Sequence, residues 1–313
     1  MSTVHSVTAQ TLKSWLDEGR GITVIDVLPP EHHDAHHIPG SLNHCVYQVV
    51  FLDELMAAIA DKTRPLVLYS GSLHCHGARD AADKLLDAGF EDITICQDGL
   101  EGWKALGLPL GGGGPEPLSP TDLGKGEFSL SVDPAASRVG WAGRNRNGAN
   151  WGAAPIAKGE IGFKDGRLAS GYFELDMRGL VNENIADQSL AAVLIRHLES
   201  RDFFLADVFP VARFEIIHVN TLVGVAAGEA NFDIKGQLTL RGVTREMCFP
   251  ATVERLDDGR ITAEAHLDVD RTLFGVNYGS GKLFERLGMH LVHDLMNIQI
   301  RVVTTAAVPL RGA

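Results

Sequence analysis

The sequence predicts two domains of different fold classes, an α/β domain followed by an all-β domain. Strand-like and helix-like segments alternate before residue 110, whereas apolar residues recur with period two after residue 127. Between these regions, four consecutive glycines and three prolines in "GGGGPEPLSPTDLGKG" cannot continue a helix or a central strand. We therefore expect a first domain over residues 1–110, a Gly/Pro-rich linker over 111–126 and a second domain over 127–307.

The first domain is predicted from apolar runs that alternate with amphipathic segments. Parallel strands need long crossover connections, which are usually helices, so this alternation indicates a parallel sheet with helices on both faces. The predicted strands lie at residues 22–28, 65–70 and 93–97, and the predicted helices at 51–60 and 77–90.

The second domain is predicted from alternation of apolar and polar residues, which is typical of antiparallel strands with one buried face. Closing such strands into a barrel removes their exposed edges, so we expect an eight-stranded antiparallel barrel with one helix at 188–200. In one predicted strand the alternation places Phe173, Leu175 and Met177 on the same face. In the next it places Phe214, Ile216 and His218 on the same face. Similar alternation continues through residues 231–240, 247–253, 261–269 and 296–303.

Composition excludes several classes of function. The chain of 313 residues has a formal net charge of −12, which argues against binding to nucleic acid, because that depends on clustered Lys and Arg. It has no apolar run long enough to span a membrane and no basic, apolar leader, so we expect a cytoplasmic protein. Its four cysteines show no paired spacing and are expected to be reduced thiols.

The first domain resembles the rhodanese-like family over nearly its whole length. The resemblance rests on three segments, which are "VIDVLPPEHHDAHHIPGSLN", "LVLYSGSLHCHGARDAADKLLDAGF" and "ICQDGLEGWKALGLPL". In that family the residue directly after the strand is the cysteine that carries the persulfide, and here this position is Ser70. Leu28 also replaces the arginine that commonly follows the Asp-Val pair. The resemblance therefore implies a domain without its usual sulfur-transfer nucleophile.

Cys75 is the alternative nucleophile in this loop. His74, His76, Arg79 and the following helix could lower the pKa of its thiol, although few loop amides remain between Cys75 and that helix. We name Ser70, Cys75 and Arg79 as the candidate catalytic residues. Whether the domain is an enzyme stays open, and we favour a domain without sulfurtransferase activity. The histidine-rich segment 31–37 fits no known zinc spacing, so no metal site is predicted.

The second domain resembles the YceI-like family of lipocalin-type, polyisoprenoid-binding barrels. The resemblance rests on "FSLSVDPAASRVGWAGR", "HLESRDFFLADVFPVARFEI", "GQLTLRGVTREMCF", "DVDRTLFGVNYGSGKLFERLG" and "LVHDLMNIQI". It implies a barrel around an elongated apolar tunnel that holds a long isoprenoid chain.

The predicted ligand-binding residues combine the inward alternation with the expected tunnel mouth. They are Phe173, Phe214, Phe232, Leu238, Leu240 and Phe249 on the wall, and Tyr278 and Ser280 at the mouth. The leading hypothesis is a cytoplasmic two-domain binding protein whose barrel holds an isoprenoid quinone or another polyisoprenoid lipid, and the sequence identifies no other cofactor. The alternative is a thiol-dependent sulfurtransferase or reductase that uses Cys75. The protein partner stays unknown.

Overall fold

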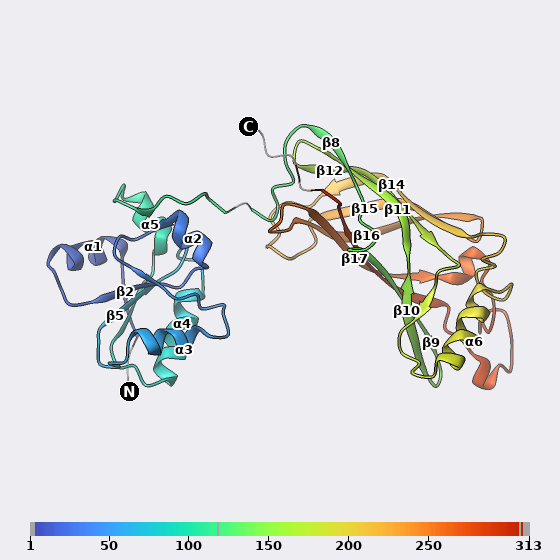
Figure 1. Cartoon of the computed structure of the whole chain (residues 1–313), viewed down its shortest axis with the longest axis horizontal. Coiled ribbons are helices and arrows are strands. Elements are labelled where there is room, and N and C mark those ends of the chain that lie inside the picture. The colour runs from blue at the N-terminus through green and yellow to red at the C-terminus, as the bar shows by residue number, and fades with distance from the viewer. Residues whose placement is uncertain (1–3, 118, 307, 309–313) are drawn as a thin grey trace. The chain divides into compact units, whose positions relative to one another are not determined.

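The computed structural model describes residues 4–117, 119–306 and 308, so the predicted outer ends of both domains lie outside the described residues. Its contacts divide the chain into two compact units, Met1–Leu118 and Ser119–Ala313 (Figure 1). Each unit has hydrophobic clusters of its own, two in the first and two in the second.

The first unit contains a five-stranded sheet in the order β1-β6-β5-β2-β4. All of its pairings are parallel, as the alternation of strands and helices predicts. The strands are β1 (His5–Val7), β2 (Thr23–Asp26), β4 (Leu42–Asn43), β5 (Leu66–Tyr69) and β6 (Ile93–Cys96).

Helices cover both faces of this sheet. Along β5, Leu66 and Leu68 pack in the cluster that contains α3 and α4, whereas Val67 and Tyr69 pack in the cluster that contains α1 and α5. Successive residues of a strand point to opposite faces, which explains why this strand is apolar throughout. The helices are α1 (Ala9–Asp17), α2 (Pro30–Ala35), α3 (Phe51–Ala58), α4 (Gly77–Asp87) and α5 (Gly99–Ala105).

The predicted linker is anchored to each unit at its ends. Gly111–Gly112 forms β7, which pairs antiparallel with β3 (His36–His37) in the first unit. A side chain at Gly112 would lie 2.5 Å from the carbonyl oxygen of Ala35, so only glycine fits there. At the other end, Leu123 is buried in the core of the second unit. The glycine run is therefore partly a strand, which its composition alone does not reveal.

The second unit is an antiparallel sheet of eleven strand segments, compared with the eight strands predicted. The difference arises because two long strands are each interrupted and the short β13 (Val181–Asn182) is added. The other segments are β8 (Glu127–Ser131), β9 (Arg138–Asn145), β10 (Gly148–Ala154), β11 (Ile156–Lys164), β12 (Arg167–Asp176), β14 (Val211–Thr221), β15 (Phe232–Leu240), β16 (Val243–Arg255), β17 (Ile261–Asp270) and β18 (Leu295–Val303).

The interrupted strands form one long hairpin that closes the barrel. β9 pairs with β10, and β8 continues the hairpin by pairing with β11. Pro155 separates β10 from β11, and a turn at Asp133, whose carboxylate accepts the N–H groups of Ala135 and Ala136, separates β8 from β9. β9 also pairs with β18, and Val132 forms a bridge with Thr304. If β8 with β9 and β10 with β11 are each counted as one interrupted strand, eight strands surround the interior.

A β-bulge in β14 corrects one detail of the predicted face. The pairing with β15 shifts between Ile216 and His218, so His218 turns outward and Val219 packs against the core instead. An inserted residue reverses the alternation beyond it, which strict period-two reasoning cannot anticipate.

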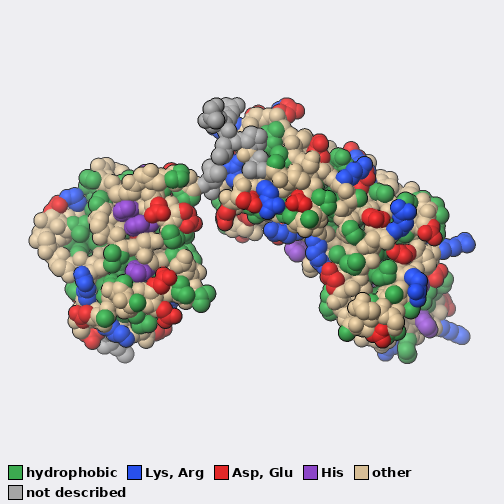
Figure 2. Space-filling model, viewed as in Figure 1, with side chains coloured by type: hydrophobic (Ala, Val, Ile, Leu, Met, Phe, Trp, Pro, Cys, Tyr) green, Lys and Arg blue, Asp and Glu red, His purple; other side chains and the backbone are tan. Residues whose placement is uncertain are grey.

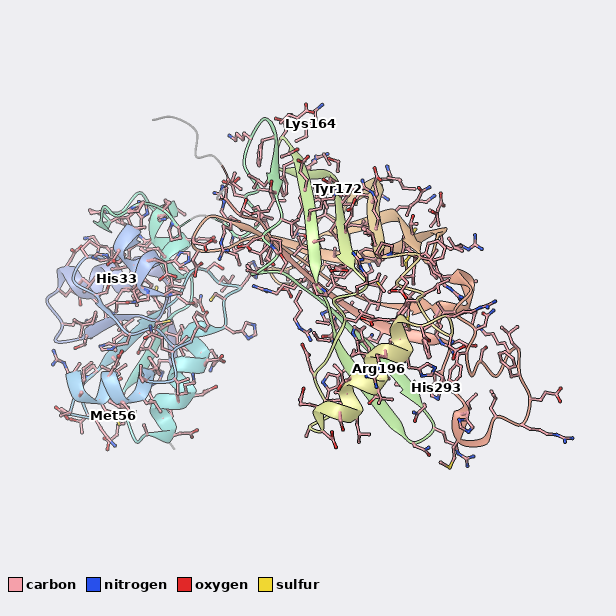
Figure 3. All side chains as sticks on the ribbon, turned by 45° about the vertical axis from the view of Figure 1, so that its right-hand side comes forward. His33, Met56, Lys164, Tyr172, Arg196 and His293 are labelled. Atoms are coloured by element: carbon pink, nitrogen blue, oxygen red, sulfur yellow. The ribbon has the colours of Figure 1, made fainter. Side chains whose placement is uncertain are left out.

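One end of the barrel is covered by α6 (Gln188–Glu199) and the segment that follows β17 (Figure 3). Asp187 caps α6 by accepting the N–H groups of Ser189 and Leu190. In the facing segment the buried Arg271 donates to the carbonyl oxygens of Val276, Val292 and His293 at 2.7–3.1 Å. These bonds fix an irregular loop where no strand ladder can do so.

On the side of each unit that Figure 2 shows, acidic, basic and apolar side chains are interspersed. Within the described residues, no helix combines the length and the apolar character that crossing a bilayer requires.

Candidate functional site

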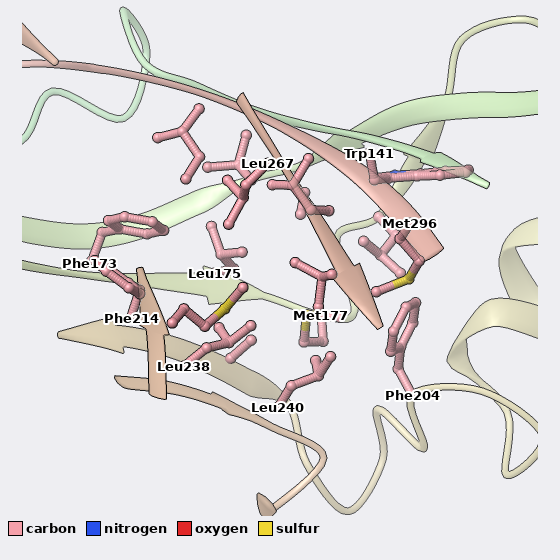
Figure 4. A pocket seen from close by; sticks show the side chains of 18 of the residues that line it. Trp141, Phe173, Leu175, Met177, Phe204, Phe214, Leu238, Leu240, Leu267 and Met296 are labelled. Carbon is pink, nitrogen blue, oxygen red and sulfur yellow. The ribbon is translucent and has the colours of Figure 1, made fainter. Parts of the chain in front are cut away.

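The interior of the barrel contains an apolar cavity of about 90 Å³ (Figure 4). Eight strand segments contribute inward-facing residues to its wall, namely β9, β10, β12 and β14 to β18. Its lining consists of Val139, Trp141, Ala154, Phe173, Leu175, Met177, Leu180, Phe204, Ala212, Phe214, Leu238, Leu240, Met247, Phe249, Leu267, Val269, Met296, Ile298 and Ile300. A cavity with such a wall favours hydrocarbon over water.

A second cavity of about 50 Å³ adjoins the first. The two share Phe173, Phe214, Phe249 and Ile300 as wall residues. The ring of Phe214 has its centroid 5.6 Å from that of Phe173 and 5.4 Å from that of Phe249. Three packed aromatic rings therefore separate two apolar chambers.

The two chambers are arranged along the strands. On β18, residues from Met296 to Ile300 line the first cavity, and Ile300 and Val302 line the second. At about 3.3 Å per residue, the first chamber extends over roughly 13 Å and both together over roughly 20 Å of this strand. The interior thus has the elongated form that an extended chain requires.

The structure brings five of the six predicted wall residues together and places the sixth elsewhere. Phe173, Phe214, Leu238, Leu240 and Phe249 all line the first cavity. Phe232 is buried in the core but lines neither cavity; it lies two residues beyond Ile234, which lines the second.

The predicted mouth residues do not contact the cavities. Tyr278 packs its ring 4.7 Å from that of His197 on α6, and it lines a separate pocket at the surface. Ser280 is completely buried and accepts a hydrogen bond from the N–H of Lys282. Neither residue is among the lining of the two cavities, so their place at a tunnel mouth stays a prediction.

Trp141 is a cavity residue that the sequence reasoning missed. It lies on β9 between Val139 and Gly143, so the same alternation could have identified it. Its indole Nε1 is buried and has no hydrogen-bond partner among the residues that the structure describes. A buried polar group without a partner is uncommon in folded proteins.

In the first unit, the loop after β5 holds Ser70 and Cys75 together. Ser70 is buried, and its hydroxyl donates to the carbonyl oxygen of Cys75 at 3.5 Å. The hydroxyl of Tyr47 lies 3.7 Å from the Cys75 sulfur. A side chain at Gly77, the first residue of α4, would come within 2.9 Å of the Tyr47 hydroxyl, so glycine permits this close packing.

The surroundings of Cys75 stabilise its thiolate. Burial raises the pKa of Cys75, but the neighbouring Ser70 hydroxyl, Gly77 amide, Tyr47 hydroxyl and Gly71 amide favour the charged sulfur, and the net effect lowers the pKa. The expectation that few loop amides remain between Cys75 and the helix stays a prediction, and Gly77 is the one amide beyond Cys75 that lowers the pKa of this thiol.

Arg79 and the histidine-rich segment 31–37 are the other parts of the first unit that the sequence singled out. Arg79 is exposed on α4 and is not among the groups that stabilise the Cys75 thiolate. In the histidine-rich segment, His33 contacts the buried carboxylate of Asp26 at 2.9 Å and stacks on His37. Within the described ranges, no group of three or more His, Cys, Asp or Glu side chains could hold a metal ion.

Comparison with known proteins assigns both halves to families. The family model described as "YceI-like domain" matches residues 130–304, more than half of the chain. The family model described as "Rhodanese-like domain" matches residues 8–106. Among solved structures, a polyisoprenoid binding domain from Saccharophagus degradans is similar to 57% of this chain and 98% of its own, with 15% identity and a TM-score of 0.42.

Two curated relatives match the first half. The HTH-type transcriptional regulator Rv0324 of Mycobacterium tuberculosis is 35% identical over 100 residues, which are 31% of this chain and 41% of the regulator. The thiosulfate sulfurtransferase GlpE of Pseudoalteromonas translucida is 29% identical over 105 residues, which are 34% of this chain and 92% of that enzyme. The chain belongs to the YceI-like family and carries a rhodanese-like domain ahead of its YceI-like domain.

Proposed function

We propose that the barrel binds a chain-like apolar lipid of the polyisoprenoid class, an isoprenoid quinone among them. The observation that carries this proposal is the pair of apolar chambers aligned along the barrel strands. Hydrocarbon buried there contributes up to about 0.8 kcal/mol per methylene, before the costs of association and of moving side chains. Membership of the YceI-like family supports the same ligand class.

A titration with isoprenoid quinones of graded chain length tests this proposal. Binding is followed by displacement of a fluorescent lipid probe from the full-length protein. Ala212 is 2% exposed and lines the first cavity, so Ala212→Leu adds three carbons to the space that the chain would occupy. We expect this variant to weaken binding of every quinone. The matched control is Gln237→Lys, on the exposed face of β15 beside Leu238, which should bind as wild type does.

The rhodanese-like unit supports a second candidate function, transfer of sulfane sulfur at Cys75 instead of at Ser70. The observation that favours it is the set of donors around the Cys75 sulfur. In such a reaction the thiolate attacks thiosulfate, the sulfur–sulfur bond breaks, sulfite leaves, and cyanide then removes the sulfur as thiocyanate. A serine hydroxyl at position 70 cannot store sulfur in this way.

Thiocyanate formation distinguishes the alternatives. If Cys75 is only a remnant, the wild type is inactive and Ser70→Cys gains activity, because the loop around position 70 is retained. Turnover by the wild type that Cys75→Ser abolishes would instead establish the second function. Ser70→Ala serves as the control for changes in the loop.

A further inference from the structure

The outer surface of the barrel has a groove of about 250 Å³ where β9 lies between its neighbours β10 and β18. Successive residues of a strand point to opposite faces of a sheet. Val139 and Ile298 point inward and line the first cavity, so Gly140 and Asn297 beside them face the groove. The groove is therefore a separate site on the other side of the same strands.

The floor of the groove carries no large side chain. Gly140 and Ala142 of β9 and Gly152 of β10 form it. A Cβ at Gly140 would lie 2.6 Å from the Arg138 guanidinium, and one at Gly152 would overlap the carbonyl oxygen of Val181. Glycine at these two positions therefore lets the guanidinium and β13 approach the floor closely, and a flat ligand can contact the backbone there.

A tryptophan and two carboxamides flank this floor. Trp151 on β10 and Asn297 on β18 both pair with Ala142, and Gln299 follows two residues after Asn297. Neighbouring strands lie about 4.8 Å apart, so the backbones that carry the indole and the amides are roughly 10 Å apart. Trp151 is 48% exposed, and Asn297 is oriented by donating to Asp268 on β17 at 3.4 Å. The groove thus has an aromatic wall and a polar wall.

The segment from Asn182 to Asn184 holds both Trp151 and Arg138 in place. The side-chain amide of Asn182 and the N–H of Glu183 each donate to the carbonyl oxygen of Trp151 at 3.0 Å. The N–H of Trp151 donates to the side-chain oxygen of Asn184 at 3.0 Å. The carboxylate of Glu183 accepts a hydrogen bond from the Arg138 guanidinium. The exposed indole therefore projects from a fixed backbone, and the charge of the arginine is compensated.

The charge and chemistry of the groove favour a neutral ligand that carries hydroxyl groups. Arg138 is the one charged residue in its described lining, and Glu183 compensates that charge, so an anion gains little there. Carboxamides both donate and accept hydrogen bonds, as hydroxyl groups do. The indole offers a flat apolar face that the C–H face of a sugar ring can cover. The volume lies below the roughly 300 Å³ at which pockets for drug-sized ligands begin, which suits a single ring.

We propose that this groove binds a neutral sugar, with one pyranose ring packed on Trp151. Its hydroxyl groups form hydrogen bonds with Asn297, Gln299 and the Arg138 guanidinium. Trp151, Asn297 and Gln299 line neither interior cavity, so this inference does not rest on the proposed lipid-binding function.

Binding is measured with full-length wild type on an array of neutral and acidic glycans, and calorimetry then gives the dissociation constant of the most strongly retained one. We expect neutral glycans to be retained. Trp151→Ala removes the aromatic wall and should weaken binding by about 10-fold or more, and Gln299→Ala should weaken it by about 3- to 10-fold. Phe284→Ala is the control, because Phe284 is an equally exposed aromatic residue of the same unit, at 49%, and lies outside the groove.

A second pair of variants tests the groove without removing a contact residue. Ala142→Leu extends a side chain from the floor into the space of the ring and should abolish retention. Ala149→Leu makes the same change at an exposed position of β10 outside the groove and should bind glycans as wild type does. Both variants should bind quinones as wild type does, since neither residue lines an interior cavity.

Three results would count against this site. Failure of wild type to retain any glycan more strongly than Trp151→Ala does would overturn the proposal. Preferential retention of acidic glycans would contradict a neutral ligand, and glycan binding that survives Ala142→Leu would exclude the groove. Each result leaves the lipid-binding proposal standing, because quinone binding is measured separately.

Discussion

The three phenylalanines between the chambers should limit the length of chain that the barrel accepts. Phe214 is 5% exposed and packs against both Phe173 and Phe249. Phe214→Ala removes the central ring and joins cavities of about 90 and 50 Å³ into one. In the empty protein this substitution should lower the free energy of unfolding by roughly 3–5 kcal/mol, because it deletes a buried ring and leaves a void.

The same substitution should change how affinity depends on chain length. An isoprene unit has five carbons, and at about 0.3 kcal/mol per non-hydrogen atom each added unit contributes about 1.5 kcal/mol, or roughly 10-fold in affinity. In wild type this gain should diminish once the chain reaches the rings, at roughly 13 Å. In Phe214→Ala it should continue into the second chamber.

The assay is probe displacement with quinones of increasing chain length on both proteins. Phe232→Ala is the matched control, because Phe232 is also buried but lines neither cavity, so it should destabilise the barrel without altering the length profile. Identical length profiles for wild type, Phe214→Ala and Phe232→Ala would show that the Phe214 ring does not limit chain length.

Three further predictions concern the loops and the domain organisation. Ser70→Ala should raise the pKa of Cys75 by removing one donor, so the pH at which iodoacetamide alkylates Cys75 at half its maximal rate should rise; an unchanged pH profile would exclude the Ser70 contact. Arg271→Ala should lower the free energy of unfolding by about 3 kcal/mol or more, because it leaves three carbonyl groups without their donor. Thermal unfolding that matches wild type would show that these hydrogen bonds do not stabilise the loop. Fragments 1–117 and 119–313 should each unfold cooperatively in calorimetry, since each unit has its own core, and solubility of one only in the presence of the other would contradict this.

Alternation and motif order were sufficient to predict both fold classes. A strand with one buried face must place every second residue inward, which is why Leu238 and Leu240 could be assigned to the wall from sequence alone. Local irregularities of the strands were not predicted. The bulge at His218, the break at Pro155 and the pairing of Gly111 depend on contacts with distant strands, and single-segment patterns do not contain them.

In the candidate sites, too, the sequence predicts where some residues lie, whereas their contacts are known only from the folded structure. Trp141 follows the period of its strand, yet its unsatisfied N–H becomes evident only when its neighbours on β10 and β18 are in place. Similarly, the Tyr47 hydroxyl lies 3.7 Å from the Cys75 sulfur although the two residues are 28 positions apart, and the sequence of the loop does not reveal this contact. Ser280 was assigned to a mouth from its flanking glycines, and its complete burial is evident only in the folded structure.

The most direct test of the central claim is mass spectrometry of the intact protein under native conditions after purification without detergent, followed by analysis of its organic extract. A lipid-binding barrel should yield a bound species whose mass matches an isoprenoid lipid. Ala212→Leu, which occupies the first cavity, should retain less of this species than Gln237→Lys does. Protein that is free of lipid in every preparation, and that takes up no isoprenoid when the lipid is supplied, would contradict the claim that the barrel is a lipid-binding site.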